Sequence, residues 1–160
     1  MYATKNDLPE ATRAKVVELL NLRLADAIDL QTQTKQAHWN VRGPNFIALH
    51  ELFDKINEDV EEYVDLIAER AVQLGGSVLG TARSVAKRTT LPEYQPASDR
   101  GHDHVVAYAT ALASFGKVAR QGIDAASEWR DADTADLFTE VSRGVDKWLW
   151  MVEAHVQTDR

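Results

Sequence analysis

Apolar side chains recur every three or four residues along most of the chain, which is the period of α-helices that bury one face. Four long stretches share this pattern. We predict helices over about residues 7–38, 45–74, 99–129 and 134–156. The second carries the clearest apolar stripe, formed by Leu49, Phe53, Ile56, Val60, Tyr63 and Ile67.

Glycine and proline mark the ends of the predicted helices. Asp7 is placed to cap the first helix, with Glu10 three residues later. Gly43-Pro44 ends that helix, since glycine is a common helix stop and proline cannot continue one. Gly75-Gly76 ends the second helix. A long connection over residues 75–98 follows, with a short helix predicted over residues 82–87.

The order of short, long and short connections favours one arrangement of four helices. Short loops make antiparallel neighbours, and the long connection crosses over between two hairpins. We therefore predict an all-α, ferritin-like four-helix bundle with a long crossover between the second and third helices. An up-down-up-down bundle is the alternative, but it needs no connection of this length. The 160 residues suit one domain, 1–160, with an N-terminal tail over about residues 1–7.

Composition and charge exclude several classes of protein. The chain has no cysteine, which excludes disulfides, zinc–thiolate sites and iron–sulfur clusters. It shows neither a signal peptide nor an apolar run of membrane-spanning length, so we expect a cytoplasmic protein with no membrane partner. The net charge of −7 disfavours nucleic acid and attracts cations, although a merely solubilising surface has the same charge.

One face of the second predicted helix carries candidate metal ligands. His50, Asp54, Asp65 and Glu69 fall within an arc of ~100° at 100° per residue. The alternative is a solvated polar face. The chain has no Glu-x-x-His pair, so the usual di-iron site inside a ferritin-like bundle is absent. His38, at the end of the first helix, can approach His50 and Asp54 because the chain reverses between them.

These candidate ligands cannot all bind one ion within one chain. Asp54 and Asp65 are eleven residues apart, or ~16 Å along a helix. Two copies of the helix that cross antiparallel near residue 60 bring His50 and Asp54 of one chain to Asp65 and Glu69 of the other. Each dimer then holds two equivalent sites of imidazole and carboxylate ligands, a set that suits Fe²⁺ and also admits zinc or manganese.

At these residues the chain resembles the Dps family of mini-ferritins. The pattern His38-Trp39-x-Val41-x-Gly43, then five residues, Leu49-His50, three residues and Asp54, matches the first family signature at every defined position. The stretch Val64-Asp65-x-Ile67-Ala68-Glu69-Arg70 matches most of the second. Val78 departs from the family pattern, which has Pro or Ala there. The likeness covers almost the whole chain, including the segment Lys147-Trp148-Leu149-Trp150-Met151.

The resemblance implies a homododecameric hollow shell, built from two-fold dimers, that oxidises Fe²⁺ and stores ferric mineral. It implies ferroxidase centres at the dimer interfaces, with hydrogen peroxide preferred to O₂ as oxidant, and a role in protection from oxidative damage. The ligands implied are the positions His38, His50, Asp54, Asp65 and Glu69. Trp39 matches a family tryptophan that intercepts stray oxidising equivalents; simple packing is the alternative.

Two further features are predicted with their alternatives. Asp131 and Asp136, with Glu128 and Asp133 close by, are candidates for an acidic pore that admits iron, and helix capping is the alternative. His102 and His104 are expected to be surface or capping residues.

DNA binding is predicted to be weak or absent. The N-terminal tail is short and carries one lysine, the C-terminal segment is weakly charged, and Arg83, Lys87 and Arg88 form the only basic cluster. The alternative function is a structural nucleoid protein with a vestigial or structural metal site.

Overall fold

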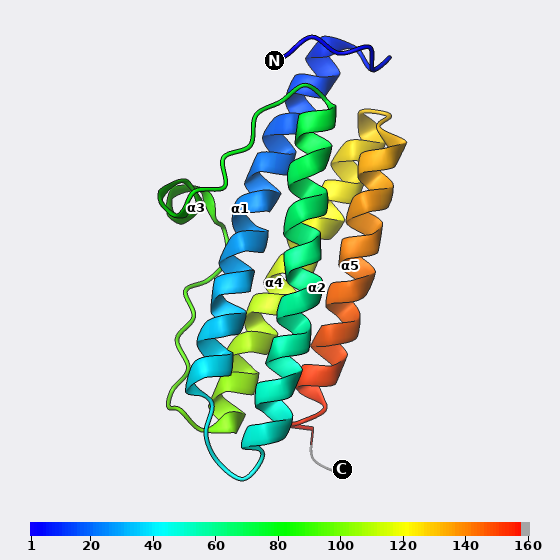
Figure 1. The fold of residues 1–160 in the computed structure, drawn as a ribbon. Helices are drawn as coiled ribbons and strands as arrows, with labels where there is room; N and C mark the ends of the chain where they lie inside the picture. The colour runs from blue at the N-terminus through cyan, green and yellow to red at the C-terminus, as the bar shows by residue number, and fades with distance from the viewer. Residues whose placement is uncertain (158–160) are drawn as a thin grey trace.

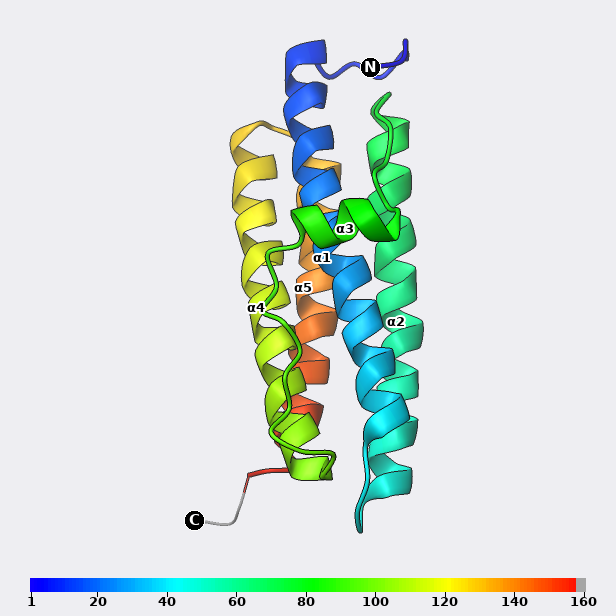
Figure 2. The ribbon, with the colours of Figure 1, turned by 90° about the vertical axis from the view of Figure 1, so that its left-hand side faces the viewer.

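Four long helices run side by side, and one short helix lies across their outer side (Figure 1, Figure 2). In chain order they are α1 (Glu10–Asn40), α2 (Phe46–Gln73), α3 (Ala82–Arg88), α4 (Gly101–Glu128) and α5 (Ala132–Glu153). The computed structural model describes residues 1–157. Residues 158–160 lie outside the described part. The predicted domain 1–160 and the predicted C-terminal segment both end there. The predicted all-α bundle and its short helix in the crossover are confirmed.

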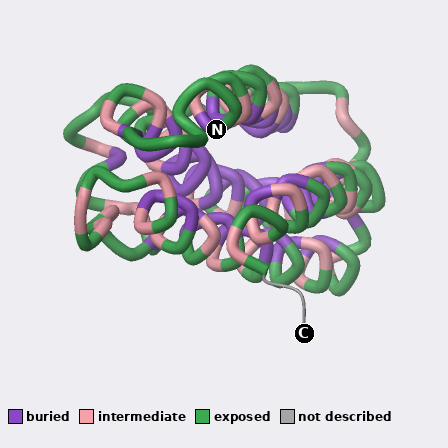
Figure 3. The backbone as a smooth tube through the Cα atoms, turned by 90° about the horizontal axis from the view of Figure 1, so that it is seen from below, coloured by how far each residue is buried: buried purple, intermediate pink, exposed green. Residues whose placement is uncertain are grey.

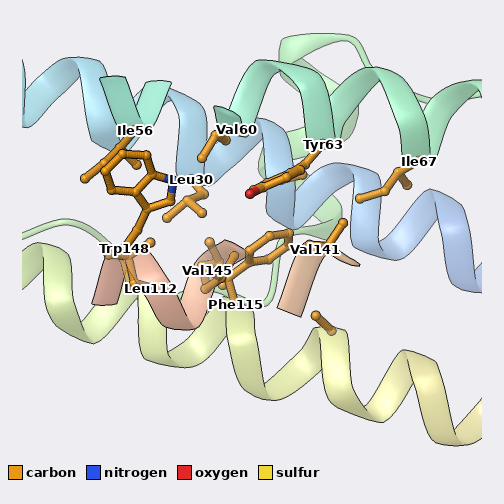
Figure 4. Packing of buried hydrophobic residues seen from close by; sticks show 14 of the residues in the cluster. Leu30, Ile56, Val60, Tyr63, Ile67, Leu112, Phe115, Val141, Val145 and Trp148 are labelled. Carbon is orange, nitrogen blue, oxygen red and sulfur yellow. The ribbon is translucent and has the colours of Figure 1, made fainter. Parts of the chain in front are cut away.

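The long helices pack as two hairpins, α1 with α2 and α4 with α5. The crossover passes outside α1 through α3 and then runs down to the start of α4 (Figure 2). Buried positions of the long helices face the middle of the bundle (Figure 3). There Ile56 and Val60 of α2 meet Val145 and Trp148 of α5 (Figure 4). The apolar stripe predicted on the second helix is entirely buried.

Two helix starts differ from the prediction for reasons of capping. Pro9, and not Asp7, occupies the N-cap of α1, so the helix begins at Glu10. The Pro9 carbonyl accepts hydrogen bonds from the backbone N–H groups of Thr12 and Arg13, and a proline has no N–H of its own to leave unpaired. The predicted start of the last helix was two residues late, because Asp131 caps α5 from the residue before Ala132.

The face of α1 that lies under the crossover is buried although it is polar. Asp26 is 0% exposed and accepts hydrogen bonds from the backbone N–H of Thr90 at 2.6 Å and from its hydroxyl at 3.1 Å. Its other carboxylate oxygen lies 3.0 Å from Nε of Arg23, which is also buried. Burial raises the pKa of Asp26, and the Thr90 hydrogen bonds and Arg23 oppose this. Asn21 and Gln33 on the same helix also bond to the crossover, through Ser77, Leu79 and Pro92.

We predict that Asp26→Ala destabilises the fold by about 3–5 kcal/mol, because it leaves the Arg23 guanidinium buried without its carboxylate. The free energy of unfolding, from denaturant titration, measures this. Glu18→Ala is the matched control, since the exposed Glu18–Arg88 pair at 2.8 Å also ties α1 to the crossover. We expect about 1 kcal/mol or less there. Equal small losses in both variants would contradict the anchoring role of Asp26.

Candidate metal centre

Two histidines face each other where α1 ends and α2 begins. Nδ1 of His38 lies 2.9 Å from the backbone oxygen of His50, and Nδ1 of His50 lies 2.9 Å from the backbone oxygen of His38. Their rings stack with centroids 3.7 Å apart. A carbonyl oxygen only accepts, so each Nδ1 carries the ring proton and donates it. These bonds engage only the Nδ1 atoms, so the Nε2 atom of each ring is the one left to bind a metal ion.

Asp54 follows His50 by one helical turn and lies beside the histidine pair. Its Oδ1 is 3.8 Å from Nδ1 of His38 and 2.8 Å from Nζ of Lys35. The hydrogen bond from Lys35 lowers the pKa of Asp54, and the charge of Lys35 adds to this. The carboxylate is thus kept ionised and ready to bind a cation. Sequence reasoning missed Lys35, although it lies three residues before His38, a spacing that puts both on one helix face.

Asp65 and Glu69 lie farther along the same face of α2, both exposed to solvent. A groove of about 650 Å³ beside Asp65 is lined largely by acids, including Glu58, Glu61 and Glu62. In the part of the chain that the structure describes, no three His, Asp or Glu side chains are placed to hold a metal ion together. Since α2 is continuous from Phe46 to Gln73, one chain presents the five predicted ligands as two separate groups.

Trp39, next to His38, is 68% exposed and does not pack in the core of its own chain. It lines a groove of about 1020 Å³ between α1, α3 and the crossover, together with Lys35, Leu91 and Tyr94. Simple packing of Trp39 therefore has no basis within one chain. The structure therefore leaves the indole open to the groove, and its predicted role toward oxidising species stays a prediction.

The acids predicted to line a pore fall into two groups. Asp131 is 2% exposed; its carboxylate accepts from Thr134 N–H at 3.1 Å, from the Thr134 hydroxyl at 2.6 Å and from Arg70 Nη2 at 2.7 Å. It is a buried helix cap tied to α2, so we correct the pore prediction for Asp131. Asp136, Asp133 and Glu128 are exposed.

One histidine predicted at the surface is buried. His102 is exposed as expected, but His104 is 1% exposed and its Nδ1 lies 2.6 Å from the hydroxyl of Tyr94. The crossover covers this part of α4, which the helical periodicity of α4 alone does not reveal.

Within residues 1–157, no helix has both the length and the apolar character needed to cross a membrane.

Comparisons with known proteins agree with the fold and the motifs. A model of the ferritin-like domain matches residues 17–160. The chain is 46% identical over 156 residues to the "DNA protection during starvation protein" of Agrobacterium fabrum, covering 98% of this chain and 96% of that protein. It is 33% identical to the protein of the same name from Brevibacillus brevis, over 89% of this chain and 95% of that one.

Solved structures show the same similarity in three dimensions. Mycobacterium smegmatis Dps in its tetragonal form matches with a TM-score of 0.92 and 31% identity, over 98% of this chain and 95% of that one. DpsC from Streptomyces coelicolor matches with a TM-score of 0.91 and 29% identity, over 100% of this chain and 92% of that one. With a family model over most of its length and close relatives at this identity, the chain belongs to the Dps family of ferritin-like proteins.

Proposed function

We propose that this protein is a ferroxidase and iron store that oxidises Fe²⁺ with hydrogen peroxide, or with O₂, and holds ferric mineral in a shell of twelve subunits. The single observation that carries the proposal is the His38–His50 pair, in which reciprocal backbone hydrogen bonds engage both Nδ1 atoms and leave both Nε2 atoms for a metal ion, one helical turn before Asp54. We propose that it acts in the cytoplasm.

The proposed site is completed by a second subunit. His38, His50 and Asp54 of one chain meet Asp65 and Glu69 of its partner across a two-fold axis, since the two groups lie ~16 Å apart on one helix. The imidazoles supply neutral ligands, and the carboxylates balance the charge of the iron that is oxidised. Zinc or manganese can take the place of iron with the same ligands.

Chemistry at two iron ions explains the protective role. Two Fe²⁺ ions each give one electron to one H₂O₂, which takes up two protons and becomes two water molecules. Because both electrons arrive at one site, no hydroxyl radical is released. Asp136, exposed near the start of α5, is the acid we retain as a candidate for the path by which iron enters.

Mixing two inactive variants tests whether the ligands come from two chains. We predict that His50→Ala and Asp65→Ala each abolish fast Fe²⁺ oxidation by peroxide in stopped-flow measurements. After subunit exchange, a mixed dimer has one doubly damaged site and one intact site, so about a quarter of all sites should recover.

The matched control mixes His50→Ala with the double variant His50→Ala/Asp65→Ala, in which no site can regain its histidine. Recovery in neither mixture, or wild-type rates in the double variant, would contradict the shared site.

Lys35 should compete with metal ions for Asp54. We predict that Lys35→Gln tightens Zn²⁺ binding at neutral pH by up to about fivefold, the range of an exposed ion pair. Because Lys35 lowers the pKa of Asp54, its removal also shifts the loss of metal binding on acidification to higher pH. Calorimetric titration at several pH values measures both effects. Lys55→Gln, next to Asp54 and exposed, removes the same charge and should change neither.

We propose that DNA binding is weak or absent, although relatives are named for DNA protection. Of the basic cluster in α3, Arg83 and Lys87 are exposed, but Arg88 pairs with Glu18 at 2.8 Å. We predict no retained complex in a gel-shift assay at about 0.15 M salt, with the same assay at about 0.01 M salt as the control that reveals weak phosphate contacts. Stoichiometric retention at the higher salt would favour the structural nucleoid role instead.

A further inference from the structure

Tyr94 and His104 form a hydrogen-bonded pair that the site described above does not use. Tyr94 lies in the crossover and His104 in the first turn of α4, where the crossover runs along that helix (Figure 2). The Tyr94 hydroxyl is 2.6 Å from Nδ1 of His104, and the two rings stack at 5.9 Å. A phenol and an imidazole at this distance can exchange a proton without any other movement.

The protonation states of the pair follow from its surroundings. Burial raises the pKa of Tyr94, so the phenol keeps its proton and donates it to Nδ1. Burial also lowers the pKa of His104, against the charges of Asp99 and Asp103, so the ring is neutral and able to accept. The ring proton of His104 then sits on Nε2, which is buried with no hydrogen-bond partner in residues 1–157. A buried polar atom left unpaired costs stability, and such atoms call for an explanation.

Tyr108 lies one helical turn after His104 on α4 and contacts two residues that are close in sequence to the candidate metal ligands. The hydroxyl of Tyr108 bonds to that of Thr34, one turn before His38 on α1. The ring of Tyr108 packs edge-on against Phe53, with centroids 5.3 Å apart, and Phe53 precedes Asp54. Tyr108 is fully buried. Tyr108 thus stands between the turn of α4 that carries His104 and the stretches of α1 and α2 that carry the candidate ligands.

We propose that Tyr94 and His104 form an oxidisable pair that supplies the second electron to peroxide when a site holds a single Fe²⁺; this rests on the ferroxidase function proposed above. One Fe²⁺ gives one electron, and Tyr94 gives the other. The phenolic proton moves to Nδ1 of His104, two protons come from solvent, and H₂O₂ becomes two water molecules. A second Fe²⁺ later returns an electron to the Tyr94 radical, and the proton moves back from His104.

Electron paramagnetic resonance tests the pair directly. Assembled protein is loaded without oxygen at about one Fe²⁺ per site, mixed with H₂O₂ and frozen rapidly. Ring-deuterated tyrosine narrows a tyrosyl signal and separates it from any signal of Trp39. We expect a tyrosyl radical in the wild type, and at least about a tenfold smaller signal in Tyr94→Phe and in His104→Asn. An asparagine oxygen still accepts the tyrosine hydrogen bond, but it does not take up the proton at neutral pH.

The controls separate a redox role from a structural one. Tyr2→Phe, at an exposed tyrosine, should keep the full signal. An undiminished signal in Tyr94→Phe would overturn the proposal. An undiminished signal in His104→Asn would also overturn it, because the hydrogen bond would then only hold the crossover against α4.

A second measurement without iron distinguishes failure of this inference from failure of the proposed function. A photo-oxidised ruthenium tris-bipyridine complex removes one electron from the protein, and we expect the radical at Tyr94 in the wild type but not in Tyr94→Phe. If light produces it while neither the wild type nor any variant oxidises iron, the pair is oxidisable, but its role as an electron donor to peroxide fails together with the ferroxidase proposal. If light produces no radical at Tyr94, or if fast iron oxidation leaves none, the inference is wrong.

Discussion

The rigid rise of one helix is the constraint on which the rest of the structure depends. Because α2 continues without a break from Phe46 to Gln73, Asp54 and Asp65 stay ~16 Å apart whatever their side chains do. A flexible loop between them could bring all the ligands together in one chain, but it would expose the apolar stripe that α2 buries. The bundle keeps the stripe, and the proposed site therefore needs a second subunit. Stability of the fold and assembly of the site are linked through this one element.

The turn between α1 and α2 fixes the half of the site that one chain can build. Gly43 adopts φ +114°, a conformation that side chains disfavour, and lets the chain reverse within five residues. Arg42 on this turn exchanges backbone hydrogen bonds of 2.9 Å with Asp99 and Gly101 at the start of α4. The same end of the bundle thus holds the histidine pair, the entry into the second hairpin and His104. Backbone contacts, and not only side chains, bring these groups into one region.

The sequence predicts the features that repeat along a helix and fails where the environment comes from a distant segment. The stripe of α2 and the approach of His38 to His50 follow from spacing and from a visible chain reversal. Asp131 does not: an acid at a helix start looks the same whether it caps or faces a pore, and its burial depends on Arg70, 61 residues earlier. The burial of Asp26 also could not be predicted from the sequence around it. The crossover covers Asp26 through Thr90, and the path of the crossover cannot be predicted from the residues next to Asp26.

Trp39 and Tyr94 are the two side chains proposed to be oxidised when peroxide does not receive both of its electrons from two Fe²⁺ ions. Both line the groove beside α1, yet their surroundings differ. Trp39 is exposed and has no hydrogen-bonded base within the described residues, so its oxidation sends a proton or a charge to solvent. In the proposed oxidation, the proton of Tyr94 moves only as far as Nδ1 of His104 and can return from there, which makes the oxidation easy to reverse. An exposed indole suits the capture of species that have escaped, whereas the part-buried, hydrogen-bonded pair suits a reversible one-electron oxidation. The two proposed roles thus differ, and the difference follows from the exposure of Trp39 and from the imidazole beside Tyr94.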